Sequence, residues 1–511
     1  MMTTPPLASY PDWKAPSEDG ASLIWPDPAK LLQDTRDNQY RLSRADRIHI
    51  QNAPLPLLRK QARQSIGHDD AQPLIATGHQ TELHHSGVWA KNPLMDTIAD
   101  RLGGRAVHLA VDTDAPKHLT LRWPGRSLPL TDDPAVSTAA WSALLAPPSP
   151  TWQIHLEQAA REDRALSYGP MLFDFLDAMK RLASSGKDFD SILTEAMHSL
   201  DGSLGLRHHT LMASAMWQSQ AFLTFAHHII ARALLFAVDY NAALGEYRQR
   251  TGTRSTMRPM PNLFIGLWAT PEAAPEAIEI PFWLDDLANG VRTRPSVFAD
   301  GQGFRLHLIN GEEFRFDPHA PADAASHDLA NFLTASRHRL SPRALTLTMF
   351  VRLLLADQFV HGIGGARYDQ VADQIIATHF GIDPPAFSVT TATLYFPGAA
   401  SRERVCMPCL VREAHRSKHA VLGPAKLGRV AQIAALPRGS AARSEAFAKL
   451  QADRRTAAAT DPSVRKWDQR IIHAKLQLQE EKTLFDRELF YAIQPRERLE
   501  RLIDHHRDAF S

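Results

Sequence analysis

The chain has 511 residues, of which 44% are hydrophobic and 22% are charged. This balance is typical of a folded globular protein and excludes a mostly disordered, collagen-like or low-complexity chain. The formal net charge is only +1. A chain built as a polycation for nucleic acid is therefore excluded, and we expect no nucleic-acid partner.

The chain also lacks the features of export and membrane insertion. Its first residues, MMTTPPLASYPDW, have neither the basic start nor the apolar stretch of a secretory signal. The best apolar run, Ala231 to Val238, is far shorter than the roughly 18 residues that span a bilayer. The two cysteines, Cys406 and Cys409, cannot build a disulfide framework, and with no other cysteine to pair with they fit a reducing compartment. We expect a cytoplasmic protein without a membrane segment.

A strand–helix–strand unit follows a proline-rich N-terminal arm over residues 1–70. The apolar run 73–77, closed by Gly78, predicts a buried strand. Next comes a predicted helix with Asn92 as its N-cap and Gly103 at its end, and then a second strand over 106–111. Two strands joined by a helix in so short a span predict a parallel sheet.

Residues 71–400 as a whole predict an α/β core that contains a helical insertion over about 151–250. Residues 252–325 carry prolines, aromatic residues and alternation, and predict short strands with a hairpin at one edge of the sheet. Ser341 and Pro342 predict the start of a helix that runs to about Leu355.

The last part of this core predicts a strand, a glycine-rich turn, a helix and a final strand. The strand covers 358–360, the turn follows at 361–365, the helix covers 367–379 and the final strand covers 388–396.

The C-terminal region, residues 401–511, is basic, with 22 Lys and Arg against 14 Asp and Glu. From Ser463 to about His506 the composition is that of one long charged helix with an apolar seam. This pattern predicts a coiled-coil arm or an antiparallel helical pair. No RNA-binding motif is recognisable there, so a solvated helix face explains the charge.

Polar side chains follow both predicted strands of the first unit. The candidate residues are Gly78, His79, Gln80, Glu82, His84 and Asn92 after the first strand, and Asp112, Asp114 and Lys117 after the second. Parallel strands present their carboxyl ends at one edge, where ligands bind. Imidazoles, carboxylates and an ammonium there suit acid–base chemistry on an anionic substrate. The alternative is that these groups only cap helices and bind loop amides.

A second candidate group surrounds the glycine-rich turn. It comprises His361, Gly362, Gly364, Gly365, Arg367, Tyr368 and Asp369. Glycines before a helix leave backbone N–H groups free for a phosphate or carboxylate. The stretch is neither a Walker loop nor a complete G-x-G-x-x-G fingerprint, so a nucleotide cofactor stays an open option beside a simple tight turn.

A weaker metal candidate lies near the start of the basic region. Cys406, Cys409, His415 and His419 offer two thiolates and two imidazoles for zinc. The gap between Cys409 and His415 is too short for a zinc finger, so we expect a coincidental pair in a loop and no zinc. A redox role ranks lower still because no thioredoxin-like unit precedes the pair.

Short stretches of the chain together resemble the bacillithiol synthase family, the cysteine-adding enzymes of bacillithiol biosynthesis. They are Thr77-Gly78-His79-Gln80, Ala110 to Asp114, Leu340-Ser341-Pro342, Val360 to Gly365, His379-Phe380-Gly381-Ile382 and the ending from Leu489 to Leu502. The chain is divergent: His79 replaces a glutamine, and Tyr368 stands at a glutamate position of the family. The stretch 359–369 looks closer to a bacterial subgroup that shares this frame without a known reaction.

The resemblance implies a Rossmann-like core, a C-terminal coiled coil that supports a homodimer, and a C–N bond-forming ligase for a small amino or thiol metabolite. In that case His79 is the acid–base group, and Gln80 and Asn92 orient the substrate. The carboxylates of Asp112 and Asp114 bind an amine, while Lys117 and the glycine turn hold an anion. Two alternatives stay open: a non-catalytic binding or scaffold protein, and a metal-dependent hydrolase that uses the histidines.

Overall fold

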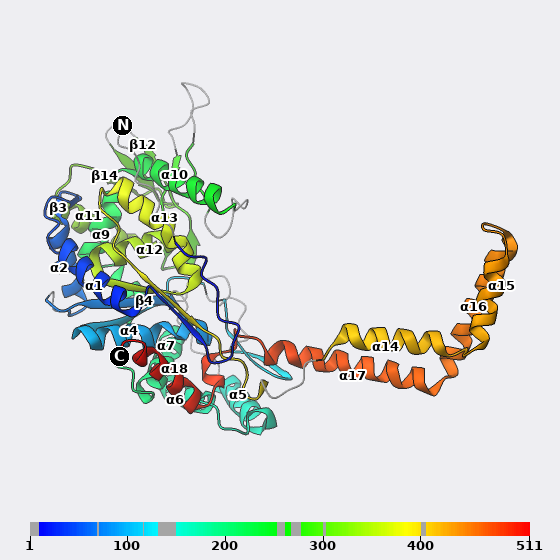
Figure 1. Ribbon diagram of the computed structural model, residues 1–511. Helices are drawn as coiled ribbons and strands as arrows, with labels where there is room; N and C mark the ends of the chain where they lie inside the picture. Colours follow the sequence, from blue (N-terminus) through cyan, green and yellow to red (C-terminus); the bar gives the residue numbers. More distant parts are fainter. Residues whose placement is uncertain are drawn as a thin grey trace. The chain divides into compact units, whose positions relative to one another are not determined.

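The computed structural model in Figure 1 describes most of the chain. The described residues are 10–68, 71–115, 117–130, 150–252, 261–266, 277–299, 303–399 and 405–511. They form two compact units. The first comprises Met1–Arg122, Ser127–Leu394 and Arg487–Ser511, and the second comprises Trp123–Arg126 and Tyr395–Asp486.

A six-stranded sheet with the order β1-β17-β16-β4-β5-β8 forms the centre of the first unit. Its strands are β1 (Ser22–Trp25), β4 (Leu74–Gln80), β5 (Arg105–Val111), β8 (His209–Met212), β16 (Gln358–His361) and β17 (Ser388–Ala392). Only β1 is antiparallel to its neighbour. The fold is therefore mixed α/β with a mostly parallel sheet.

The predicted strand–helix–strand unit is confirmed. Helix α4 (Lys91–Leu102) joins β4 to β5, and the two strands pair in parallel from Leu74↔Arg105 to Gln80↔Val111. The predicted N-cap was wrong, because Ala90 occupies that position and Asn92 lies inside the first turn. Gly103 ends the helix with φ +63°, a left-handed conformation that glycine adopts without a Cβ penalty.

From the two neighbouring central strands β16 and β4, the connecting helices lead toward opposite edges of the sheet. From β4 it passes through α4 to β5 on one side, and from β16 it passes through α13 (Ile363–His379) to β17 on the other. The loops after β4 and β16 therefore diverge at the carboxyl ends of the strands. In open α/β sheets this is the position where ligands bind.

The alternation of side chains along the strands divides the core between the two faces of the sheet. Leu74 and Leu109 pack on one face with helices α9 (Gln220–Ile230) and α10 (Ala233–Thr251). Ile75 on the opposite face packs with apolar residues of α4. Both faces are covered by helices, so the central strands are buried and apolar, as parallel strands require.

The short strands after residue 276 form two smaller sheets of their own. Their orders are β14-β13-β12-β9 and β11-β10-β15, with β9 (Ala277–Glu279), β10 (Phe282–Asp286), β11 (Val291–Thr293), β12 (Ser296–Ala299), β13 (Phe304–His307), β14 (Glu313–Phe316) and β15 (His338–Pro342). The predicted hairpin exists, but its place at the edge of the main sheet was wrong.

Ser341 and Pro342 end strand β15 instead of opening a helix. The Ser341 hydroxyl donates to the buried Asp285 carboxylate at 2.6 Å, and the strand pairs with β10. Helix α12 (Ala344–Phe350) begins only after Arg343. The Ser-Pro signal was thus overridden by pairing with a distant strand.

Helices occupy most of residues 150–252, the span predicted to be a helical insertion. They are α5 (Pro150–Glu162), α6 (Leu172–Ala183), α7 (Phe189–Ser203), α8 (Ala213–Met216), α9 and α10. Within this span β8 joins the main sheet beside β5, which was not predicted. Among the described helices none alone has the length and apolarity to cross a membrane; only α9 with α10, bent by 85°, meets those criteria as a pair.

The described part of the second unit contains four helices, which are coloured yellow to red-orange in Figure 1. They are α14 (Met407–Ala420), α15 (Ala425–Ala435), α16 (Ala441–Thr460) and α17 (Pro462–Leu484). Helix α14 packs beside α17, and α15 packs beside α16. Lys418 of α14 pairs with Asp468 of α17 at 2.8 Å.

The single helix predicted from Ser463 to His506 is broken. Helix α17 ends at Leu484, and α18 (Arg496–Asp508) is a separate helix that belongs to the first unit. Between them Phe490 and Tyr491 are buried in the first unit, and Pro495 precedes α18. Burial of these aromatic side chains and the missing N–H of proline both oppose one continuous helix.

The structure describes the following further elements. They are α1 (Pro28–Leu42), β2 (His49–Ile50), β3 (Ala53–Pro54), α2 (Leu55–Ser65), α3 (Ser86–Trp89), β6 (Thr120–Trp123), β7 (Arg126–Pro129), η3 (Arg164–Leu166), α11 (Ala322–Ala335), η4 (Val351–Leu355) and η6 (Tyr491–Ile493).

Candidate functional site

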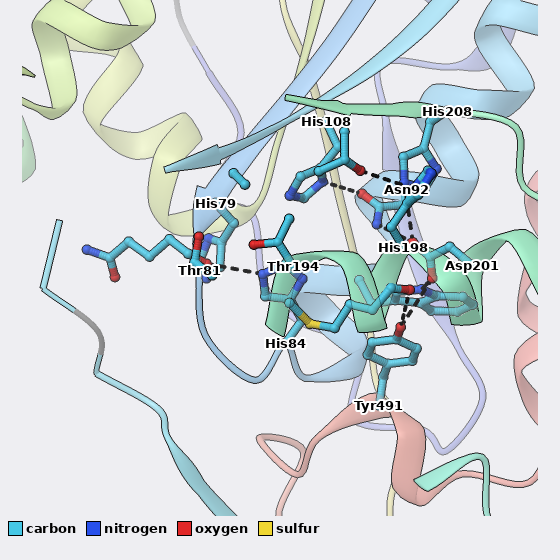
Figure 2. Close-up of a pocket in the computed structure, with 15 residues that line it drawn as sticks. His79, Thr81, His84, Asn92, His108, Thr194, His198, Asp201, His208 and Tyr491 are labelled. Carbon is cyan, nitrogen blue, oxygen red and sulfur yellow. Dashed lines mark hydrogen bonds and ion pairs between the residues drawn. The ribbon is translucent and has the colours of Figure 1, made fainter. Parts of the chain in front are cut away.

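A polar cavity opens at the carboxyl ends of β4 and β5, as Figure 2 shows. Its lining comprises His79, Gln80, Thr81, His84, Trp89, Asn92, His108, Ala110, Thr194, Met197, His198, Asp201, His208, Thr210 and Tyr491. Five of these side chains are imidazoles. The free volume is about 20 Å³, which is room for a single water molecule.

Strand and helix periodicity explain why these side chains meet. His79 on β4 and His108 on β5 follow the alternation that points Ile75 and Ala106 toward α4. On α7, residues 194, 197, 198 and 201 recur at helical spacing and so share one face. The cavity is therefore enclosed between the sheet, α4 and α7.

The five imidazoles form a chain across the cavity. Ring centres are separated by 5.1 Å between His79 and His84, 5.6 Å between His84 and His108, 6.1 Å between His108 and His208, and 5.2 Å between His208 and His198. Burial lowers the pKa of His84 and His108 well below the usual range and that of His208 to about 3. These three rings are neutral near pH 7.

The imidazole chain does not form a metal site. Across the described ranges no three His, Cys, Asp or Glu side chains come together in a way that could hold a metal ion. The geometry thus gives no support to the metal-dependent hydrolase alternative.

Asp201 connects the row of five imidazoles to the surrounding helices. Its Oδ1 accepts from Trp89 Nε1 at 2.7 Å and from the Tyr491 hydroxyl at 3.2 Å, and its Oδ2 accepts from Asn92 Nδ2 at 2.8 Å. Burial raises the pKa of this carboxyl to about 6. Asp201 thus accepts three hydrogen bonds, and its pKa lies only about one unit below neutral pH.

Asn92 links this carboxylate to the imidazole chain. With its amide nitrogen directed at Asp201, its Oδ1 accepts from His108 Nδ1 at 2.8 Å (Figure 2). This bond sets the tautomer of His108, whose Nε2 is left as an acceptor. Both ends of the Asn92 amide are therefore hydrogen-bonded within the protein, and the side chain positions His108.

His79 and Glu82 form a pair at the more exposed end of the row of five imidazoles. His79 Nε2 lies 3.1 Å from Glu82 Oε1, and 29% of the His79 side-chain surface is exposed. Burial alone would raise the pKa of Glu82, but hydrogen bonds from His79 and from the Lys117 backbone N–H hold it at about 2. Burial and the nearby Lys91 lower the pKa of His79, so its neutral ring can accept a proton.

Lys91 is a functional candidate that sequence reasoning missed. Its ammonium donates to the Gly78 carbonyl at 2.7 Å, and the side chain is buried. Burial lowers its pKa to about 7. The available signal was a lysine inside the apolar stretch from Val88 to Met95, at the start of a helix that covers a sheet.

Of the predicted site residues after β4 and β5, His79, Gln80, His84 and Asn92 line this cavity. Asp112 does not line it: its buried Oδ1 accepts from the Ser214 N–H at 2.8 Å, and burial raises its pKa. Asp114 binds Gln80 Nε2 and lies 3.0 Å from Arg292 Nη1. Lys117 contributes its backbone N–H to Glu82, while its side chain is exposed.

The glycine-rich turn after β16 differs in detail from the prediction. Gly362 is the N-cap of α13, and Gly364 and Gly365 lie inside its first turn rather than before it. A Cβ atom at Gly362 or Gly364 would meet nothing within 4 Å, so this helix end is open. At Gly365 a Cβ atom would lie 2.8 Å from His361 Nδ1, which requires glycine there.

A contact between the side chains of His361 and Asp369 links the end of β16 to α13. Their Nε2 and Oδ2 atoms lie 2.7 Å apart, and Arg352 Nη1 donates to the same Oδ2 at 2.7 Å. Burial would raise the pKa of Asp369, but the Arg352 guanidinium lowers it well below the usual range. Arg367 donates to the Trp13 carbonyl at 3.0 Å, and Tyr368 packs against the hydrophobic core.

The two cysteines are joined to each other in a disulfide. Cys406 is the N-cap of α14 and Cys409 lies in its first turn, so the predicted coincidental pair in a loop was wrong. His415 and His419 follow on α14 with ring centres 4.2 Å apart, and His419 is hydrogen-bonded to Arg454. The two sulfurs of the predicted metal candidate are therefore bonded to each other.

No protein-family model matches this chain, and no curated protein matches it. The functional assignment therefore depends on the chemistry of the cavity and on the motif resemblance.

Proposed function

We propose that this chain is an enzyme similar to bacillithiol synthase, a ligase that forms a C–N bond on a small amino or thiol metabolite. The observation that supports it most is the His79–Glu82 pair at the partly exposed end of the histidine-lined cavity, where β4 ends. A neutral imidazole oriented by a carboxylate is a general base. The Rossmann-like divergence of the loops after β4 and β16 agrees with the resemblance.

In this proposal His79 prepares the nucleophile. Its Nε2–H is directed to Glu82, so Nδ1 accepts a proton from the substrate's ammonium group. The freed nitrogen lone pair attacks an activated acyl carbon of the second substrate, and the leaving group departs with the bonding electron pair. The ionised Glu82 then stabilises the imidazolium that has formed.

Lys91 supplies a second proton-transfer group beside this pair. An amine with a pKa of about 7 carries a proton in about half of the molecules at neutral pH. It lies close enough to His79 to lower the pKa of that imidazole. We infer that Lys91 tunes the base and assists the departing group.

The start of α13 supplies the anion site of the proposal. The first N–H groups of a helix have no partner within the helix, so those at the start of α13 suit a phosphate or carboxylate, and a nucleotide offers the first of these. Strand β16 is the immediate neighbour of β4, so this helix end belongs to the same edge of the sheet as His79.

For the second unit we propose a coiled coil that joins two copies of the chain. Large apolar side chains are exposed on its helices; they are Val411, Leu427, Val430, Phe447, Ile472 and Leu476. Ile472 and Leu476 lie one helical turn apart on α17 and so share a face. Exposed apolar side chains at this spacing favour association of helices.

Thermal-shift measurement with cysteine, glucosaminyl malate and ATP, followed by a turnover assay, tests the proposed ligase. A ligand at 100 times its Kd adds about 2.7 kcal/mol, which is readily detected. We expect His79→Gln and Glu82→Gln to keep binding and to lose at least about 100-fold in turnover. His209→Gln, an exposed histidine at the start of β8, is the matched control and should keep full activity.

Binding without turnover in the unaltered chain would support the non-catalytic alternative. Full activity of His79→Gln would show that the base lies elsewhere. Failure of all three ligands to shift the melting temperature would reject the bacillithiol-type substrates.

A further inference from the structure

The disulfide of the second unit lies at a position that favours thiol chemistry. Cys406 caps α14, Pro408 stands in the first turn and Cys409 follows, so both sulfurs are at the positive end of the helix. Both cysteines are exposed to solvent. A thiolate at a helix N-terminus within a C-x-x-C pair has a lowered pKa, and is therefore both a good nucleophile and a good leaving group.

A cationic cavity adjoins this disulfide. It has a volume of about 590 Å³ and is lined by both cysteines together with Lys466, Arg470 and His473 of α17. Within the described side chains neither Lys466 nor His473 forms an ion pair, and the Arg470 guanidinium stacks on Trp467 at 4.4 Å from the ring centre. The volume suits a small molecule, and the charge favours an anionic one.

We propose that Cys406 and Cys409 form a reversible redox couple that exchanges with a small anionic thiol bound in this cavity. The proposal depends only on the second unit and is independent of the ligase proposed for the first. It assigns the thiol by its chemistry: one sulfur nucleophile and at least one carboxylate that the Lys466 and Arg470 side chains bind.

The exchange proceeds in two balanced steps. The thiolate of the bound thiol attacks one sulfur of the disulfide; the S–S bond breaks, a mixed disulfide forms, and the other cysteine leaves as a thiolate. A second thiolate then attacks the small-molecule sulfur of the mixed disulfide and releases the second cysteine. Two electrons pass from two thiols to the protein disulfide, and the products are one oxidised small-molecule disulfide and a protein dithiol.

The test measures how fast glutathione, an anionic thiol, reduces the full chain, with alkylation and mass analysis of Cys406 and Cys409. The double variant Lys466→Gln with Arg470→Gln should be reduced about three- to tenfold more slowly by glutathione. Neutral 2-mercaptoethanol should reduce variant and parent at equal rates. The matched control removes the same charge from exposed positions on α16, with Lys449→Gln and Arg455→Gln, and should behave as the parent.

Added salt should also reduce the difference in glutathione reduction rate between the parent and the cavity variant, because salt screens the exposed charges of Lys466 and Arg470. Equal rates with glutathione for both double variants would overturn the assignment of the cavity. Failure of the reduced chain to re-form the disulfide in oxidised glutathione would overturn the redox couple itself. Because both readouts use cysteine modification alone, a negative result leaves the ligase proposal untouched.

Discussion

Replacement of Lys91 by methionine tests whether an ammonium is truly buried beside His79. The pKa of Lys91 is lowered from 10.5 to about 7 by burial. At about 1.4 kcal/mol for each pKa unit, the charged amine costs the folded state about 5 kcal/mol. Methionine has a similar length and no charge, so Lys91→Met removes this cost.

The sign of the pH dependence follows from the two pKa values. Between about pH 7 and pH 10.5 the unfolded chain keeps a proton that the folded chain has lost, so the parent gains stability as the pH rises. The variant has no such gain. Its advantage over the parent should therefore shrink by about 3 kcal/mol between pH 6 and pH 9.

The assay is urea unfolding of parent and variant at both pH values. Loss of the hydrogen bond to the Gly78 carbonyl costs the variant about 1–3 kcal/mol, but this cost does not depend on pH and cancels in the comparison. Lys60→Met removes an exposed lysine from α2 and is the control, with no expected pH-dependent gain. A stability difference for Lys91→Met that is equal at the two pH values would refute the reasoning.

Three further substitutions test the contacts described above, each by chemical denaturation. Asp201→Ala leaves three buried donors without an acceptor and should cost about 3–6 kcal/mol; a loss under about 1 kcal/mol would contradict its connecting role. Arg352→Met removes the guanidinium from two buried carboxylates, those of Asp369 and Asp373, and should cost about 3–5 kcal/mol, unlike a surface arginine. Gly365→Ala should cost about 1–3 kcal/mol through its contact with His361, whereas Gly364→Ala, facing open space, should gain up to about 1 kcal/mol. Equal effects at the two glycines would show that the first turn of α13 is packed differently.

Local signals were sufficient to predict the centre of the fold. The apolar run before Gly78 and the helix ended by Gly103 follow from short-range preferences, and β4, α4 and β5 lie where these signals place them. Strand β8 could not be found in this way. It is short, it starts at a histidine instead of an apolar residue, and it is stabilised by pairing with β5. The helix expected across residues 485–495 fails for the same reason, since burial of Phe490 in the first unit outweighs local preference.

The candidate site was predictable only for the part that follows β4. His79 and Gln80 are the last two residues of a recognisable strand and His84 follows it closely, so the rule for parallel sheets places them at the carboxyl edge. Asp201 and Tyr491 meet in the same cavity although 290 residues separate them. Their meeting depends on the packing of α7 and η6, which no local pattern of residues contains.

Most of the second unit is inserted between residues 394 and 487 of the first unit. Residues on the two sides of this insertion are hydrogen-bonded to each other within the first unit. The chain leaves after Leu394 and returns at Arg487, whose Nη2 donates to the Thr391 hydroxyl at 2.8 Å and to the Ala392 carbonyl at 3.2 Å. Strand β17 therefore keeps its register with β1 and β16 whatever the length of the helices in between. Such an insertion can be lengthened, shortened or rewritten during evolution without disturbing the sheet. The cysteine pair and the histidine cavity thus take their lining residues from different units of the protein.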